Sequence, residues 1–159
     1  MNKECNTLNK AVQSLAIHLA LERTDNARSH GIADLKVGDQ PGWLTDLEGI
    51  GGEIAACKLF QAYPDTIITI PLQPYDFISK TGKTVDVKTT KHETGRLTAT
   101  LKKKVEDCDM YVLMIGEFPR YRYAGSASAT DLIDEKNIGE MGKKGRAYIL
   151  TQEQLRRHT

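Results

Sequence analysis

Three acidic residues and one lysine are the side chains in this sequence whose types and spacing could do chemistry. Asp76, Asp86 and Lys88 lie close together in the chain, and Glu53 precedes them in a segment with helical periodicity. Two neighbouring carboxylates repel each other unless a positive charge lies between them. The pair Asp76 and Asp86 therefore indicates a site for a divalent metal ion, with both residues as ligands.

The sequence around the two aspartates predicts a β-hairpin. Residues 80–82, Lys-Thr-Gly, fit a three-residue loop in which a type I turn is closed by a glycine in the left-handed region. With this loop, Asp76 lies opposite Asp86, at a Cβ separation of about 4.5–5.5 Å. Lys88 shares the face of Asp86 because side chains alternate along a strand. A two-residue loop would break this alignment. The residues expected to face the core are Val85 and Val87.

Glu53 occupies an unusual position in its predicted helix. Residues 47–63 have apolar side chains at helical spacing, and Glu53 falls in or beside the apolar stripe. A carboxylate there is costly unless it is paired, hydrogen-bonded or bound to a metal. The two glycines that precede it, Gly51 and Gly52, allow another backbone to come close. Glu53 is therefore a candidate for the same site.

Composition limits the class of protein. A chain of 159 residues suits one domain, and 40% hydrophobic with 27% charged residues is ordinary for a globular protein. No apolar run is long enough to span a membrane and the N-terminus lacks a signal-peptide pattern, so we expect no membrane association and a cytoplasmic location. The three widely spaced cysteines predict neither a disulfide framework nor a metal-binding pair. The net charge of +1 means that a DNA-binding surface must come from local clusters.

Helical and strand patterns alternate along the chain. The mixed order predicts an α/β fold with a central sheet. Residues 110–116 form a nearly continuous apolar run, which is typical of a central strand buried on both faces. Residues 25–42 are expected to form a polar connector, and residues 102–109 a short helix. The other expected elements are a helix over 7–23, strands over 66–70, 96–101, 120–124 and 148–150, a helix through 131–133 capped by Ser126 or Ser128, and a short helix capped by Thr151.

Taken together, the four residues resemble a known family. A helical acid (Glu53), Pro-Tyr-Asp at 74–76 and Asp-Val-Lys at 86–88 are similar to the motif of the PD-(D/E)XK nuclease superfamily. One residue separates the proline from the first aspartate, and the second acid is Asp where many relatives have Glu. The resemblance covers about residues 46–125. The segments 49–56 and 85–90 also look like those of small nucleases from phages and mobile elements.

The resemblance implies a restriction-endonuclease-like fold, with a mixed central sheet flanked by helices in a single domain over 1–159. It implies a Mg²⁺-dependent DNA nuclease, with Mn²⁺ as a substitute, that leaves a 5′-phosphate. The backbone carbonyl of Val87 would be a further metal ligand, and Glu53 would bind a second metal or hold a water. Lys88 would orient or help deprotonate the attacking water and offset charge on the phosphate. A homodimer is a further expectation, as is the host cytoplasm if the protein is phage-encoded.

Residues beyond the motif are candidates for DNA contacts. Thr90 and Lys91 continue toward the expected DNA side, although Thr90 could equally be an ordinary strand threonine. The run Lys102, Lys103 and Lys104 follows the strand after the motif and is the preferred phosphate contact. His92 fits a solvent-facing loop better than a catalytic base, and a core or hinge role suits Trp43 better than base stacking. Other basic clusters, expected to be solvated surfaces, are Arg120 with Arg122, Lys143-Lys144 with Arg146, and Arg156-Arg157.

Several alternatives stay open from the sequence. Asp76 and Asp86 could lie on a solvated hairpin face with Lys88 as an ion-pair partner. The chain could be a non-catalytic DNA- or protein-binding module that retains the nuclease fold, or a metal-dependent phosphatase or nucleotide hydrolase. If it is a nuclease, the sequence does not choose among a structure- or junction-selective endonuclease, a phage or mobile-element nuclease and a site-specific enzyme, nor between endo- and exonucleolytic action.

Overall fold

The structure is a computed structural model that describes residues 5–31, 42–67 and 73–157. It is a mixed α/β protein with two sheets, as the sequence predicts at the level of fold class. One sheet has five strands in the order β1-β6-β5-β3-β2, and the other has three in the order β4-β8-β7. The helices are α1 (Lys10–Ser29), α2 (Gly42–Leu59) and α3 (Ala129–Leu132). The strands are β1 (Cys5–Thr7), β2 (Phe77–Ile78), β3 (Thr84–Thr90), β4 (Leu97–Thr100), β5 (Met110–Glu117), β6 (Arg120–Ser128), β7 (Ile138–Glu140) and β8 (Arg146–Leu150).

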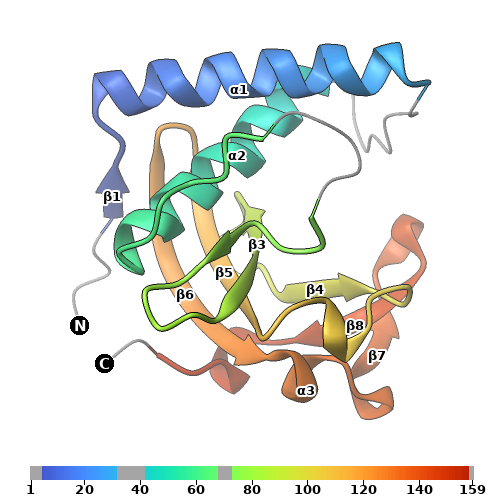
Figure 1. The fold of residues 1–159 in the computed structure, drawn as a ribbon. Helices are drawn as coiled ribbons and strands as arrows, with labels where there is room; N and C mark the ends of the chain where they lie inside the picture. The colour runs from blue at the N-terminus through green and yellow to red at the C-terminus, as the bar shows by residue number, and fades with distance from the viewer. Residues whose placement is uncertain (1–4, 32–41, 68–72, 158–159) are drawn as a thin grey trace.

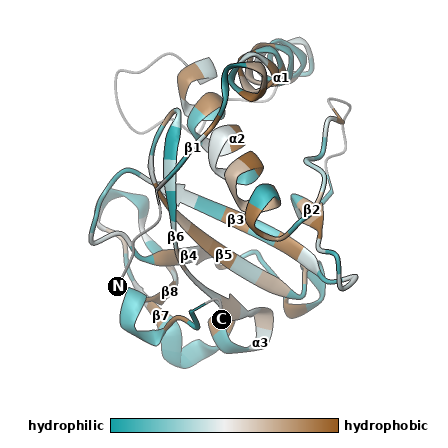
Figure 2. Ribbon diagram, turned by 90° about the vertical axis from the view of Figure 1, so that its left-hand side faces the viewer, coloured by the Kyte–Doolittle hydropathy of each residue, from teal (hydrophilic) through white to brown (hydrophobic). Residues whose placement is uncertain are grey.

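The elements stack in layers. Helix α2 packs on one face of the five-stranded sheet, α1 crosses over α2, and the three-stranded sheet lies on the opposite side (Figure 1). Figure 2 shows the same order from the side, with the two long helices above the sheet and β4, β7 and β8 below it. The core is accordingly divided into two apolar clusters, one under α2 and one between the sheets.

Strand β5 is the central strand that its apolar sequence predicts. It pairs in parallel with β3 on one side and antiparallel with β6 on the other. Its side chains alternate between the two clusters, which is why the strand is apolar at almost every position. Val112 and Met114 pack under α2, whereas Tyr111, Leu113 and Ile115 pack between the sheets.

The hairpin that carries the aspartates has the predicted register. Phe77 pairs with Val85 and Ile78 with Thr84. The Ser79 N–H donates to the Lys83 carbonyl at 2.8 Å, and Gly82 has a φ of 82°, so the three-residue loop is confirmed. Without a Cβ, Gly82 adopts this left-handed conformation at little cost.

Other boundaries differ from the predictions. Helix α1 starts after the Asn9 cap and continues to Ser29, beyond the predicted end at residue 23 and into the predicted connector. The extra turns are held by tertiary contact, since Thr24 is buried and donates a hydrogen bond to Asp46 of α2. Of the strand predicted over 66–70, residues 66 and 67 are not in a strand, and 68–70 lie outside the described residues.

The C-terminal half follows the predictions closely. The expected strands at 96–101, 120–124 and 148–150 correspond to β4, β6 and β8, Ser128 caps α3, and Thr151 begins a short 3₁₀ helix. The segment 102–109 contains only a 3₁₀ turn over Val105–Asp107. In the portion that the structure describes, no helix combines the length and apolar character needed to cross a membrane.

Candidate active site at the outer edge of strand β3

Asp76 closes the outer edge of β3. Its own N–H donates to the Val85 carbonyl at 2.8 Å, and its Oδ2 accepts a hydrogen bond from the Val87 N–H at 2.6 Å. Strand β2 pairs with β3 through only two residues, Phe77 and Ile78. Asp76 comes just before them, and its side chain rather than a further strand residue binds the next N–H of β3. Because the N–H and C=O of one strand residue point to the same side, the Val87 carbonyl also faces this edge.

Asp86 is buried in the sheet and paired with two lysines. Only 3% of the residue is exposed. Its Oδ2 accepts a hydrogen bond from Lys103 Nζ at 2.7 Å, and its Oδ1 forms an ion pair with Lys88. Within the described part of the chain, Oδ1 accepts no well-oriented hydrogen bond. Asp86 therefore does not lie on a solvated hairpin face, although Lys88 is its ion-pair partner as that alternative expects, and Lys103 is a second one.

Glu53 reaches the site from helix α2. Its side chain is 19% exposed, and its Oε2 accepts a hydrogen bond from Arg23 of α1 at 3.3 Å. The helix comes close to β3 because Gly52 lies directly against the Thr89 side chain, where a Cβ would overlap the Thr89 hydroxyl. Glu53 is thus fixed by a close helix–strand contact that its preceding glycine permits.

The charges of these residues act on one another. Burial and, to a smaller extent, the negative charges of Glu53 and Asp86 raise the pKa of Asp76 to about 7, although the Val87 N–H and Lys88 lower it. Burial likewise raises the pKa of Glu53, while Arg23 and Lys88 lower it and Asp86 raises it. The four predicted residues therefore share one electrostatic environment.

The thiol of Cys57 lies beside the same acidic residues. Burial raises its pKa to about 12, with additional contributions from Glu53, Asp76 and Asp65. The thiol lies one helical turn after Glu53 in α2 and is buried. Such a neutral thiol is a poor nucleophile, and its surroundings mark a concentration of negative charge.

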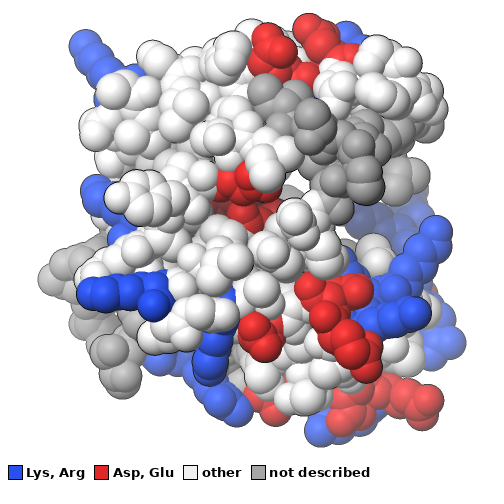
Figure 3. Space-filling model, in the orientation of Figure 1, with Lys and Arg blue, Asp and Glu red and all other residues white. Residues whose placement is uncertain are grey.

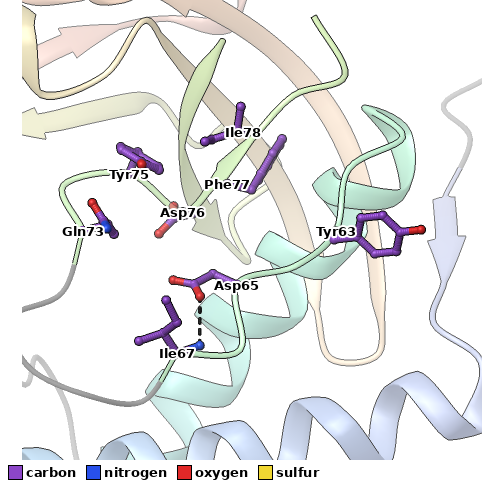
Figure 4. A pocket seen from close by; sticks show the side chains of 8 residues that line it. All are labelled: Tyr63, Asp65, Ile67, Gln73, Tyr75, Asp76, Phe77 and Ile78. Atoms are coloured by element: carbon purple, nitrogen blue, oxygen red, sulfur yellow. Dashed lines mark hydrogen bonds between the residues drawn. The ribbon is translucent and has the colours of Figure 1, made fainter. Parts of the chain in front are cut away.

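A pocket of about 330 Å³ opens beside Asp76. Figure 4 shows Asp65 and Asp76 directing their carboxylates into it, with Tyr75 and Gln73 on the same wall. Asp65 is held in place because its Oδ1 accepts from the Ile67 N–H at 2.8 Å and its carbonyl accepts from Arg23 at 3.0 Å. Figure 3 shows acidic side chains set into the middle of this face, between the helices and the sheets.

The predicted DNA contacts separate into two kinds. Thr90 lines a pocket beside Lys88, and Lys91, Lys102 and Lys104 are exposed. Lys103 instead turns inward, since it donates to Asp86 and, at 2.8 Å, to the Pro74 carbonyl. Burial lowers the pKa of Lys103, but the hydrogen bond and charge of Asp86 outweigh this, so the net change is a rise. A buried carboxylate requires such a partner.

Two residues in this region were not singled out from the sequence. Arg23 connects Glu53 with the Asp65 backbone, and Asp65 adds a carboxylate to the pocket. In the sequence, Arg23 is an ordinary basic residue of a helix and Asp65 an ordinary acidic residue of a loop, so no local pattern distinguishes them. Of the two weaker candidates, His92 is exposed, and Trp43 is half-buried and packs against the cluster under α2.

The donor set fits a hard divalent cation. Mg²⁺ prefers oxygen ligands and needs only one or two carboxylates, because it keeps several waters. Asp76 and Asp86 supply carboxylates, and among the described residues the buried Asp86 Oδ1 has the Lys88 ammonium as an ion-pair partner but accepts no well-oriented hydrogen bond. Across those residues, no three His, Cys, Asp or Glu side chains are grouped so that they could hold a metal ion together. Asp86 is turned toward its lysines, so joint ligation with Asp76 requires it to exchange at least one of these contacts.

The sequence matches no protein-family model, and no curated protein matches it at a significant level.

Proposed function

We propose that this protein is a divalent-metal-dependent nuclease that hydrolyses phosphodiester bonds in DNA. The observation that carries the proposal is the convergence of Glu53, Asp76, Asp86 and Lys88 from a helix and a hairpin on one partly buried edge. Raised carboxyl pKa values and buried ion pairs are common at catalytic sites.

The order of elements supports a restriction-endonuclease-like core as the finer description of the fold. Helix α2 is followed by the hairpin β2–β3, then by β5 parallel to β3 and β6 antiparallel to β5. Glu53 lies on α2, Asp76 directly before β2, and Asp86 and Lys88 on β3, an order that agrees with what the resemblance implies.

Asp76, Asp86 and the Val87 carbonyl would hold Mg²⁺, for which Mn²⁺ could substitute. When bound, the ion would lower the charge barrier at the phosphate and make water a better nucleophile. Glu53 would position the attacking water from the helical side. The Lys88 ammonium would donate to the phosphate oxygen that gains charge. Lys103 would orient Asp86 through its hydrogen bond to Oδ2. Water attack in line with the leaving oxygen would leave a 5′-phosphate on the product.

The test is conversion of supercoiled plasmid to nicked or linear DNA with Mg²⁺ or Mn²⁺. We expect cleavage by the wild type and none with EDTA or with Asp86→Asn. Absence of cleavage on supercoiled, linear, branched and single-stranded DNA, with the protein folded, would overturn the proposal.

One observation favours a second candidate, a non-catalytic DNA-binding module. Lys88 and Lys103 already neutralise Asp86 without a metal. In that case DNA binding would persist without cleavage and would not respond to Mg²⁺. Release of phosphate from nucleotides, but not cleavage of polymers, would instead select a small-molecule hydrolase.

The type of nuclease, a homodimer and a cytoplasmic location stay predictions. Cleavage of branched against linear duplexes tests junction selectivity, and light scattering of the purified protein tests the dimer.

A further inference from the structure

The second sheet forms one wall of a trough that begins at the candidate active site. Lys88 and Lys103 face β4 and β8 across a hollow of about 260 Å³. A second hollow of about 380 Å³ continues past Thr90 toward Arg96. Both hollows are lined by Lys88, Thr98, Met141 and Lys144, so they form one connected trough.

The trough is basic. Beyond the two lysines that pair with Asp86, its lining includes Arg96, Lys144 and Arg146. Arg146 lies 3.9 Å from Glu140 in an exposed ion pair, an interaction that contributes little. Among the described lining residues there is no acidic side chain. Figure 3 shows basic side chains gathered at the right-hand edge, over the region of β4 and β8 in Figure 1.

The lining also identifies how a ligand would be recognised. The neutral polar groups are threonine hydroxyls from β3 and β4, including Thr90 and Thr98, and these donate readily to phosphate oxygens. The described lining contains no Trp, Tyr or Phe, and His92 is its one aromatic ring, so it offers little surface for base stacking. Such a surface suits the sugar-phosphate backbone of a nucleic acid rather than its bases.

We propose that this trough holds the DNA strand next to the scissile phosphate, with Lys144 of the β7–β8 turn and Arg146 of β8 binding its phosphates. The inference rests on the proposed function, since it places the substrate of that site. Lys88 lies at the junction, where it contacts both Asp86 and the trough. Binding is therefore electrostatic and independent of base sequence.

The test compares neighbouring basic residues on the same turn. Lys144→Ala and Arg146→Ala remove trough cations, whereas Lys143→Ala removes an exposed lysine that does not line the trough. Fluorescence anisotropy with labelled single-stranded and duplex oligonucleotides, in EDTA at 50–200 mM salt, measures affinity without cleavage. Each lost phosphate contact should lower the slope of log K against log salt by about 0.7–0.9. We expect this from the two trough variants and an unchanged slope from Lys143→Ala. Circular dichroism verifies that all three variants are folded.

Two results would overturn the inference: equal weakening by Lys143→Ala and Lys144→Ala, or cleavage by the wild type with unchanged binding by both trough variants. Failure of the proposed function would look different. If the wild type binds DNA but never cleaves it with Mg²⁺ or Mn²⁺, and the trough variants lose binding, the trough would stand as a DNA-binding site and the nuclease proposal would be wrong. Affinities that differ strongly among oligonucleotides of equal length and different sequence would refute backbone recognition.

Discussion

An acidic pocket and a basic trough open on either side of the hairpin β2–β3. The pocket beside β2 receives the carboxylates of Asp65 and Asp76, with Glu53 close by. The trough beyond β3 is lined by Lys88, Lys103, Lys144 and Arg146. Asp86 lies between the pocket and the trough, since its neighbour Asp76 lines the pocket and its ion-pair partner Lys88 lines the trough.

The proposed function assigns different ligands to the acidic pocket and the basic trough. Carboxylates brought together in a buried place favour a small cation, because each charge raises the free energy of its neighbours. Cations along an exposed trough favour a polyanion and need little burial to act. In the proposed nuclease, a phosphodiester in the trough would meet the divalent metal ion at Asp86, and hydrolysis needs the phosphodiester and the metal ion at the same place.

The largest expected effect comes from removing the boundary charge. Asp86→Asn keeps the size of the side chain but loses the carboxylate that meets both hollows. We expect cleavage to fall by about 10²–10³-fold, measured as the initial rate of plasmid nicking. Asp25→Asn, at an exposed position of α1, is the matched control and should cleave at the wild-type rate. Equal rates for the two variants would remove Asp86 from the site.

The lysine run 102–104 provides a sharper test, because the structure separates its members. Lys103 contacts Asp86, whereas Lys102 is exposed. Lys103→Met should lower the cleavage rate or the Mg²⁺ affinity by about 10–100-fold, as loss of a residue that orients a ligand does. Lys102→Met should leave the Mg²⁺ dependence unchanged. If titration of cleavage with Mg²⁺ shows equal losses, the run acts only as a phosphate contact.

The contact that brings Glu53 to the acidic side can be tested by two glycines of α2. Gly52→Ala places a Cβ against Thr89 and should destabilise the protein by about 1–3 kcal/mol, measured by urea unfolding. Gly49→Ala has open space and should be neutral or stabilising by up to about 1 kcal/mol. A neutral Gly52→Ala would contradict the close helix–strand contact.

The smallest expected effect is a pH dependence of stability in the metal-free protein. The pKa of Asp76 is about 7 in the folded state and about 3.9 in an unfolded chain. The folded state therefore binds more protons between these values, and the free energy of unfolding falls as the pH rises from about 4 to 7. We expect thermal denaturation to show a lower Tm at pH 7.5 than at pH 5, by on the order of a few °C.

Asp76→Asn should flatten this dependence, because the amide does not titrate. Mg²⁺ at pH 7.5 should raise the Tm of the wild type more than that of Asp76→Asn, since a bound cation favours the ionised site. A Tm that rises steadily from pH 5 to 7.5 without metal would contradict the crowded carboxylates.

Local patterns carried much of the prediction. The loop 80–82 set the hairpin register by its glycine, and the register placed Asp76 beside Asp86. The apolar run in β5 identified the central strand, because a strand that is buried on both faces is apolar at nearly every position and does not alternate with polar residues. Both properties depend on near neighbours in the chain, so a sequence can reveal them.

Long-range partners could not be predicted in the same way. Nothing local shows that Arg23 meets Glu53, thirty residues away, or that Lys103 rather than Lys102 turns toward Asp86. The extension of α1 to Ser29 likewise depends on a contact with α2.

The sequence by itself determined the four candidate residues, the hairpin and the α/β class, because turn chemistry and periodicity are local. Only the tertiary structure decided which cations hold the carboxylates, that Asp65 joins them, and that the second sheet lines a basic trough. These depend on which segments the packing of α2 and the two sheets brings together, and buried charges take whatever partners that packing places within reach.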